Sequence, residues 1–171
     1  MDHFEVEKSL NKMTLLVDTR EHPGKALERR LAVCGLPSER QKLLAGDYSC
    51  KIERPDGSTQ SFADEIAIER KMNIDELAMC FGTQRKRFTA EFDRAAEAGV
   101  KIYLLVENAS WESLYNHRYR SKMSPQALIA SIDAFRVRYG MQLDFCKAET
   151  TGKRLRDILF REVKERLQNE Q

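Results

Sequence analysis

The sequence predicts one α/β domain in which a mixed central β-sheet is flanked by helices. Short apolar runs that end in charged residues alternate with segments whose apolar residues recur every three or four positions. Their order is strand, helix, hairpin, helix, strand, helix, strand, helix, which is typical of an α/β layer structure. The chain has 171 residues, 42% of them hydrophobic, and this is enough for a single domain with a buried core.

The chain begins with a polar segment, a strand and a helix. Residues 1–12 are polar and are expected to be flexible, which leaves residues 13–171 as the folded domain. Residues 13–17 form a short apolar run of the kind that makes a buried strand. Residues 25–34 have apolar side chains at helical spacing, and Gly35 is a natural helix end.

A β-hairpin is expected next. Gly46 permits a bend before a strand that continues over residues 49–53, and residues 54–58 have the composition of a tight turn. The return arm is predicted from about residue 60 to Lys71.

The second half of the chain predicts helices separated by two strands. Residues 75–98 are helical in pattern, with a break at residues 82–83, and residues 100–106 read as a buried strand. A loop containing Trp111, Tyr115 and Tyr119 is expected to follow.

The last three elements have clear boundaries. Ser124 and Pro125 begin a helix that Gly140 ends, and residues 143–146 resemble a final strand. Thr150 or Thr151 would cap the last helix, whose apolar row has strict i, i+4 spacing and consists of Leu155, Leu159, Val163 and Leu167. The apolar rows on the last two helices fit a buried core best. Part of a dimer face would have the same pattern, so a homodimer stays open.

Composition excludes several classes of protein. Four widely spaced cysteines without CxxC pairs and three histidines provide no zinc-site spacing, so free thiols in a reducing compartment are expected. The sequence contains no apolar run of about 18 residues and no signal-peptide pattern. We therefore expect a cytoplasmic, intracellular protein that does not enter a membrane.

The charged residues amount to 33% but nearly cancel, to a net charge of +2. Net charge alone therefore does not indicate a nucleic-acid partner, although local basic clusters can form a binding surface. The most suggestive cluster is Arg118, Arg120 and Lys122, which we expect to contact a DNA backbone with Tyr115 and Tyr119 nearby. A solvated loop with its tyrosines in the core is the alternative.

An acid and a lysine two residues apart suggest a site. Glu69 and Lys71 would face the same side of a strand, where they could hold a divalent cation and stabilise developing negative charge. Asp47, on the other hairpin arm, can approach Glu69, whereas Asp18 can do so only if the first strand lies beside the hairpin. Oxygen ligands favour Mg²⁺ or Mn²⁺. Capped turns and an exposed charge run would explain the same residues, and the similar Glu53-Arg54 pair lies at a turn and lacks the lysine.

An ordered set of motifs extends this reading. Asp18-Thr19-Arg20-Glu21, Gly46-Asp47-Tyr48 and Glu69-Arg70-Lys71 followed by Asp75 resemble the motifs of the XPF-type structure-specific endonucleases. The likeness continues with Arg87-Phe88 and Glu91, where many members have Gln in place of the glutamate. It covers roughly residues 13–165, so residues 13–171 resemble an XPF-type nuclease domain.

The resemblance implies a fold, a chemistry and a role for each matching residue. The fold is a restriction-endonuclease-like αβ core, and the activity is cleavage of DNA with Mg²⁺ or Mn²⁺. Asp18, Asp47 and Glu69 would ligate the metal, and Lys71 would orient the attacking water or stabilise the charged transition state. Arg87 would touch the DNA backbone. The residues that would support the site or hold phosphate are Arg20, Glu21, Arg70 and Asp75.

Larger members carry helix-hairpin-helix motifs or a helicase, neither of which is present in this sequence. The chain therefore resembles a stand-alone nuclease domain of bacterial or phage type, acting on branched or single/double-strand junction DNA in repair or recombination. The alternatives are a junction-resolvase or restriction-type nuclease on the same fold and a catalytically silent DNA-binding subunit.

Overall fold

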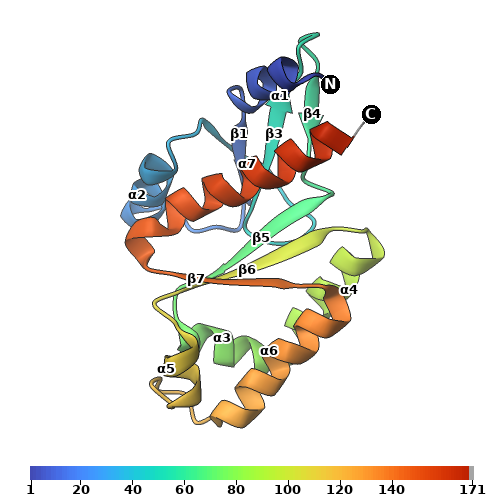
Figure 1. Ribbon diagram of the computed structural model, residues 1–171. Coiled ribbons are helices and arrows are strands. Elements are labelled where there is room, and N and C mark those ends of the chain that lie inside the picture. The colour runs from blue at the N-terminus through green and yellow to red at the C-terminus, as the bar shows by residue number, and fades with distance from the viewer. Residues whose placement is uncertain (170–171) are drawn as a thin grey trace.

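A mixed seven-stranded sheet runs through the computed structural model, which describes residues 1–169 (Figure 1). The sheet order is β2-β1-β3-β5-β6-β7, and β4 pairs with β3 beside this path. The strand pairs β1–β3, β3–β4 and β3–β5 are antiparallel, and the pairs β1–β2, β5–β6 and β6–β7 are parallel. The strands are β1 (Thr14–Val17), β2 (Ser38–Arg40), β3 (Tyr48–Glu53), β4 (Thr59–Ser61), β5 (Ile66–Lys71), β6 (Lys101–Glu107) and β7 (Gln142–Cys146).

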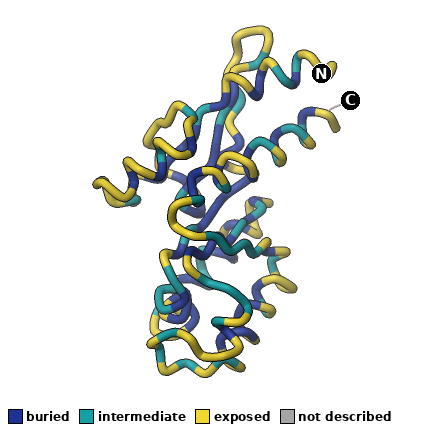
Figure 2. The backbone as a smooth tube through the Cα atoms, turned by 60° about the vertical axis from the view of Figure 1, so that its left-hand side comes forward, coloured by how far each residue is buried: buried dark blue, intermediate teal, exposed yellow. Residues whose placement is uncertain are grey.

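Helices cover both faces of the sheet and enclose two large hydrophobic cores, which confirms the α/β prediction; a third, small cluster consists of Leu16, Leu43 and Ala63. One core lies between the sheet and α3, α4 and α6, and the other lies under α1, α2 and α7. Figure 2 shows the buried backbone following the strands, with the exposed residues on the outer helix faces and loops. The helices are α1 (His3–Leu10), α2 (Lys25–Cys34), α3 (Ile74–Phe81), α4 (Arg85–Glu97), α5 (Trp111–Tyr115), α6 (Pro125–Tyr139) and α7 (Thr151–Asn169), with a 3-10 turn at Ala148–Thr150.

The side chains of β5 alternate between the two faces of the sheet. Ala67 packs into the core under α3, α4 and α6, whereas Ile66 and Ile68 pack into the opposite core. Side chains alternate along a strand, so Glu69 and Lys71 share the side of Ala67, and Arg70 shares the side of Ile68.

Three expectations about individual elements were wrong. Residues 1–12 are not a flexible segment, because residues 3–10 form α1, with a capping box between Asp2 and Glu5 and with Val6 and Leu10 buried. The return arm is two strands rather than one, since the chain turns between β4 and β5. The segment expected to be a loop contains α5, capped by Ser110.

The strand β2 was not predicted at all. Its three residues are exposed, so it has neither the apolar run nor the alternation that reveals a strand in a sequence. Residues 170–171, which the predicted domain also included, lie outside the described residues. No helix within residues 1–169 combines the length and the apolar character needed to cross a membrane.

Close contact between α2 and α7 requires a glycine at position 152. A Cβ atom there would lie 2.4 Å from the Arg30 carbonyl oxygen and 2.6 Å from the Cys34 backbone nitrogen, and neither backbone atom can turn aside. We therefore predict that Gly152→Ala lowers the free energy of unfolding by about 1–3 kcal/mol, because the two helices must separate. Urea denaturation measures the change, with Lys153→Ala, at the exposed neighbouring position, as the control. Equal midpoints for the two variants would contradict this account of the packing.

Candidate active site

Glu69 and Lys71 form a buried ion pair at the carboxyl end of β5. The Lys71 Nζ donates a hydrogen bond to Glu69 Oε1 and lies 5.4 Å from the centroid of the Phe88 ring on α4. Burial disfavours the charged amine, but the adjacent Glu69 carboxylate outweighs it and raises the pKa of Lys71. The lysine is therefore a cation held in place under α4.

Asp47 approaches this pair from the start of β3. Its backbone N–H donates to the Ile68 carbonyl oxygen at 2.9 Å, and its Oδ2 accepts a hydrogen bond from the Arg70 N–H at 2.8 Å. Burial and then the negative charge of Glu69 raise the pKa of Asp47 well above its usual range. Burial likewise raises the pKa of Glu69, against the opposing effect of Lys71.

Gly46 makes this approach possible. It has φ +73°, and a Cβ atom on it would lie 3.0 Å from both the Ala67 Cβ and the Ile68 carbonyl oxygen. A side chain would therefore be strained and would push the Asp47 backbone away from β5.

Glu91 on α4 is a site residue that the sequence motifs alone did not assign. Its Oε1 accepts a hydrogen bond from the Gly46 N–H at 3.1 Å, and its charge is one of the causes that raise the pKa of Glu69. Arg87 is exposed one helical turn earlier, and residues four apart share a helix face. The resemblance included Glu91 without giving it a role, and its position one turn after Arg87 is the signal that could have suggested this placement.

Asp18 lies beside Asp47 through the backbone, but its carboxylate is engaged locally. Its N–H donates to the Asp47 carbonyl oxygen at 2.8 Å and β1 pairs with β3, so the first strand lies beside the hairpin, which was the condition for Asp18 to approach Asp47. Asp18 Oδ2 accepts from the Leu43 N–H at 2.7 Å, and Oδ1 accepts from the N–H and Nε of Arg20 at 2.9 and 2.6 Å. Despite burial, these bonds lower the pKa of Asp18. Its role as a metal ligand stays a prediction.

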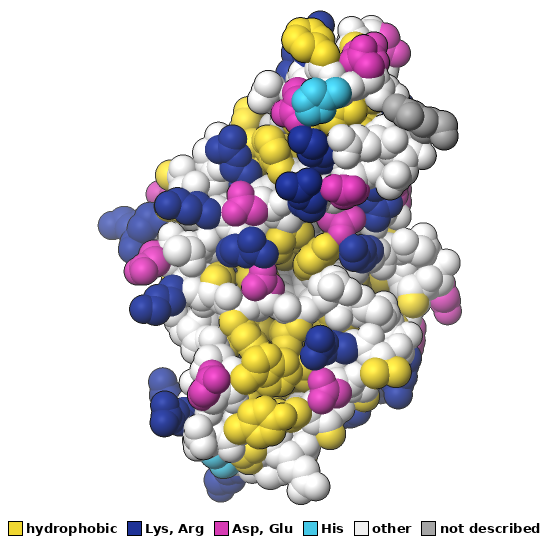
Figure 3. Space-filling view, in the orientation of Figure 1, with side chains coloured by type: hydrophobic (Ala, Val, Ile, Leu, Met, Phe, Trp, Pro, Cys, Tyr) yellow, Lys and Arg dark blue, Asp and Glu magenta, His cyan; other side chains and the backbone are white. Residues whose placement is uncertain are grey.

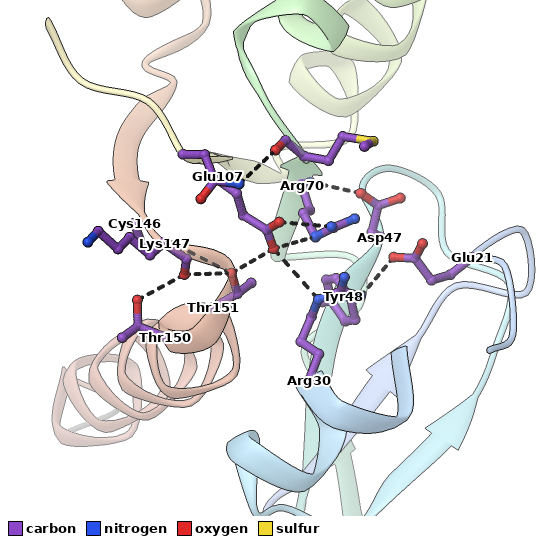
Figure 4. Close-up of polar contacts among 12 residues, drawn as sticks. Glu21, Arg30, Asp47, Tyr48, Arg70, Glu107, Cys146, Lys147, Thr150 and Thr151 are labelled. Atoms are coloured by element: carbon purple, nitrogen blue, oxygen red, sulfur yellow. Dashed lines mark hydrogen bonds and ion pairs between the residues drawn. The ribbon is translucent and has the colours of Figure 1, made fainter. Parts of the chain in front are cut away.

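Because side chains alternate along β5, Arg70 faces the side of the strand opposite Glu69. It forms a bidentate ion pair with Glu107 at the end of β6 (Figure 4). Its Nε lies 2.7 Å from Glu107 Oε1 and its second terminal nitrogen 2.9 Å from Oε2. Thr151 at the start of α7 donates to the same Oε1 at 2.6 Å. The guanidinium therefore supports the site and is not free to hold phosphate, while the Arg70 backbone N–H holds Asp47.

The same network continues to Glu21. The Arg30 Nε lies 3.8 Å from Glu107 Oε1, and an Arg30 terminal nitrogen donates to the Tyr48 hydroxyl at 2.7 Å. Tyr48 in turn donates to Glu21 Oε2 at 2.7 Å, and the charge of Glu21 contributes to the raised pKa of Asp47. Glu21 is thus next to the site but bound through Tyr48 (Figure 4).

Asp75 does not contact Asp47 or Glu69; it supports the basic loop instead. Its Oδ1 accepts hydrogen bonds from the backbone N–H groups of Arg120 and Ser121 at 2.8 and 2.7 Å, which fixes the basic loop against α3. The cationic side chains of this loop, Arg118, Arg120 and Lys122, are all exposed. The nearby Tyr119 is partly buried, and its hydroxyl donates to the Met123 carbonyl oxygen at 2.8 Å.

Asp47 and Glu69 offer part of a donor set that could hold a metal ion. Within residues 1–169, no three His, Cys, Asp or Glu side chains are grouped as a preformed metal-binding cluster. Asp47 and Glu69 nevertheless each keep one oxygen, Oδ1 and Oε2, that accepts no hydrogen bond from a described residue. Two such oxygens on carboxylates with raised pKa values are suited to a hard divalent cation.

Basic and acidic side chains are interspersed over the face that α2 and α7 cover in Figure 3, in keeping with the small net charge. A continuous basic surface is therefore not apparent on this face. The four cysteines are free, as expected.

Comparison with known proteins agrees with this fold. The family model of the ERCC4 domain matches residues 17–154. The solved structure of XPF from Aeropyrum pernix is similar with a TM-score of 0.61 and 21% identity over 87% of this chain and 61% of that chain. A structure of XPF from Aeropyrum pernix in complex with DNA gives a TM-score of 0.61 and 22% identity over 89% of this chain and 65% of that chain. No curated protein matches the sequence significantly.

The present chain thus spans less than two-thirds of the length of either XPF chain. The matched residues extend from the end of β1 to the start of α7 and include every acid of the site described above. The likeness confirms the restriction-endonuclease-like α/β core. With most of its residues covered by the family model, the chain belongs to the ERCC4 domain family and is an XPF-type nuclease domain.

Proposed function

We propose that this domain is a metal-dependent DNA endonuclease that hydrolyses phosphodiester bonds. The observation that carries the proposal is the meeting of Asp47 and Glu69 beside the buried cation of Lys71. Membership of the ERCC4 domain family supports it, as does the similarity to an XPF structure described as a complex with DNA. Branched or junction DNA as the substrate, a role in repair or recombination, a homodimer and an intracellular location are further parts of the proposal that rest on the resemblance.

Asp47 and Glu69 would hold Mg²⁺ or Mn²⁺ through their unengaged oxygens. Burial and nearby negative charges drive both carboxylates towards protonation, and a cation between them would favour their anionic forms. The bound ion would supply Lewis-acid stabilisation of the phosphate and would lower the pKa of a coordinated water. Asp18 is a proposed third ligand. It would have to exchange a present contact for the cation, and exposed Arg20 is the partner most able to move.

The chain's own residues would provide positioning and charge. Lys71 would stabilise the negative charge that develops on the phosphate, and Glu69 holds its amine in place for that task. The Arg70 N–H orients Asp47, and Glu91 anchors the Gly46 bend in front of it. Arg20 and Arg87 would contact the DNA backbone.

Removing either central acid is predicted to abolish cleavage without unfolding the protein. Glu69→Gln and Asp47→Asn should each lower the rate by at least about 100-fold, because a preorganised charge at the reacting phosphate is lost. The assay offers linear, flap, fork and splayed-arm DNA with Mg²⁺ and with Mn²⁺.

Glu53→Gln is the matched control, since Glu53 belongs to the similar Glu-Arg pair at the end of β3 and is partly exposed beside Lys12. It should cleave at the wild-type rate. Cleavage at the wild-type rate by both central variants would remove the assignment.

Asp47 is also predicted to lower the stability of the folded protein at neutral pH when no divalent ion is bound. Because the folded protein raises the pKa of Asp47, it binds a proton there more tightly than the unfolded chain does. Without divalent ions, this group therefore contributes stability at low pH that is lost as the pH rises above the ordinary carboxyl range. Asp47→Asn, which keeps an oxygen for the Arg70 N–H, should raise the melting temperature at neutral pH in EDTA.

Divalent ions should reverse this order of stability. Mg²⁺ or Mn²⁺ is expected to stabilise the wild type and to leave Asp47→Asn nearly unchanged, since binding to the folded state raises its stability. Thermal unfolding with and without the ions measures both effects. A variant that melts below the wild type in EDTA, with the same response to Mg²⁺, would contradict the proposed ligand role.

A further inference from the structure

An arginine outside the sequence motifs holds the turn that follows β1. Arg40 is the last residue of β2, and one terminal nitrogen of its guanidinium donates to three backbone carbonyl oxygens of this turn. The acceptors belong to Asp18, at 3.3 Å, to Thr19, at 3.1 Å, and to Glu21. Because carbonyl oxygens accept but never donate, a shared donor is what lets the three converge, and a cationic donor makes the stronger hydrogen bonds.

The strand β2 places this guanidinium beside the turn. Its three residues are exposed and none of them is apolar, so burial does not explain why the segment joins the sheet. It pairs in parallel with β1, and in this register Arg40 lies opposite Val17, the residue before Asp18. The Gln41 N–H continues the pairing to the Val17 carbonyl oxygen at 2.9 Å. The last side chain of β2 is therefore delivered to the point where β1 ends and the turn begins.

The chain that follows β2 holds the side chain of the same acid. The Leu43 N–H donates to Asp18 Oδ2, while Arg40 donates to the Asp18 carbonyl oxygen, so one short segment fixes both the carboxylate and the backbone of Asp18. The Glu21 N–H donates to this carbonyl oxygen as well, at 3.1 Å. Among these donors, Arg40 is the one that contacts three residues of the turn, so its loss would release the turn as a whole.

We propose that Arg40 is a positioning residue of the nuclease site. It fixes the turn from Asp18 to Glu21, and through this turn it sets the directions of the two carboxylates without contacting the metal ion or the DNA. The Glu21 carboxylate is also bound from the other side by Tyr48, so the turn is held at both ends (Figure 4). Residues that orient the ligands of a metal ion typically contribute about 10–100-fold to metal affinity or activity.

This inference rests on the proposed function, in which Asp18 is a metal ligand, and adds a residue that controls its geometry. The rival role for an exposed arginine near a nuclease site is direct contact with a DNA phosphate. The two roles predict different changes, because a phosphate contact acts on DNA binding, whereas a positioning contact acts on the rate with DNA bound.

Three variants separate the roles. Arg40→Met removes the charge and every donor but keeps an unbranched side chain. Arg40→Lys restores a single nitrogen with three donors, and a single nitrogen is what the turn uses. Lys42→Met is the matched control, since it removes an exposed cation two positions further along the same segment.

Cleavage of saturating DNA gives the first result. Arg40→Met should lower the rate about 10-fold or more and should raise the Mg²⁺ concentration that gives half of the maximal rate. Arg40→Lys should recover most of the loss, and Lys42→Met should cleave at the wild-type rate. Fluorescence anisotropy in the Glu69→Gln background measures binding without cleavage, and there all three variants should bind DNA with nearly the affinity of their parent.

Hydrogen exchange reports on the turn itself and requires no cleavage. The N–H groups of Arg20 and Glu21 are bonded to Asp18, so Arg40→Met should speed the exchange of amides in residues 19–21 and leave those of β3 unchanged. Arg40→Lys should restore the slow exchange. A uniform rise across the sheet, with a matching fall in melting temperature, would show a general contribution to stability and would overturn the inference.

Two further results would also overturn it. One is weaker DNA binding by Arg40→Met at an unchanged saturated rate, which would show a phosphate contact. The other is a wild type that cuts DNA while Arg40→Met cuts it equally fast, which defeats only the role of Arg40. A wild type that leaves linear and branched DNA uncut in both Mg²⁺ and Mn²⁺ defeats the nuclease assignment instead, whatever the exchange of the turn shows.

Discussion

The Arg70–Glu107 ion pair joins the parts of the fold on which the site depends. It connects the carboxyl ends of β5 and β6, and through Thr151 it also reaches the start of α7. Burial opposes the ionisation of Glu107, but the hydrogen bond from Arg70 comes next in effect and the pKa of Glu107 is lowered overall. Breaking such a buried pair by removing one partner typically costs about 3–5 kcal/mol, because a charge is left uncompensated.

Strand alternation places the Arg70 side chain on one face of β5 and the side chains of its sequence neighbours on the other. With Arg70 bound on one side of β5, Glu69 and Lys71 must face the other side, where α4 covers them. The backbone N–H of Arg70 remains available at the strand end and is the donor that orients Asp47. One residue thus contributes to both faces, with its guanidinium supporting the core side and its amide supporting the site.

Electrostatic strain is concentrated at two other acids, Asp47 and Glu69. Asp47 and Glu69 are brought together by a bend at Gly46 and have raised pKa values, whereas the acids around them, Asp18 and Glu107, are well paired. At the site, the folded state therefore gives up stability at Asp47 and Glu69, the two carboxylates whose pKa values are raised. Such a contrast between neighbouring acids is typical of functional sites.

Local patterns were sufficient for most elements and for the core of the site. The i, i+4 row of α7, the proline and glycine that bound α6, and the break after α3 all depend on residues near one another in sequence. The same holds for Glu69 and Lys71, whose common face requires only the period of a strand. The exceptions are short or exposed elements: β2 has no apolar residue, and α1 was hidden by a polar composition in which Val6 and Leu10 are the buried minority.

The sequence by itself determined the α/β class, the acid–lysine pair, the motifs of the family and the loop that carries the exposed cations. Only the tertiary structure decided which partner each of these side chains has. It placed Glu91 at Gly46, bound the Arg70 guanidinium to Glu107, joined Asp18 Oδ2 to the Leu43 N–H, and set Asp75 against the basic loop. The physical reason is that these contacts join residues on separate elements, up to 46 positions apart, and no local period or propensity encodes them. The direction of a side chain can be read from its own strand, but its partner depends on how the other strands and helices pack.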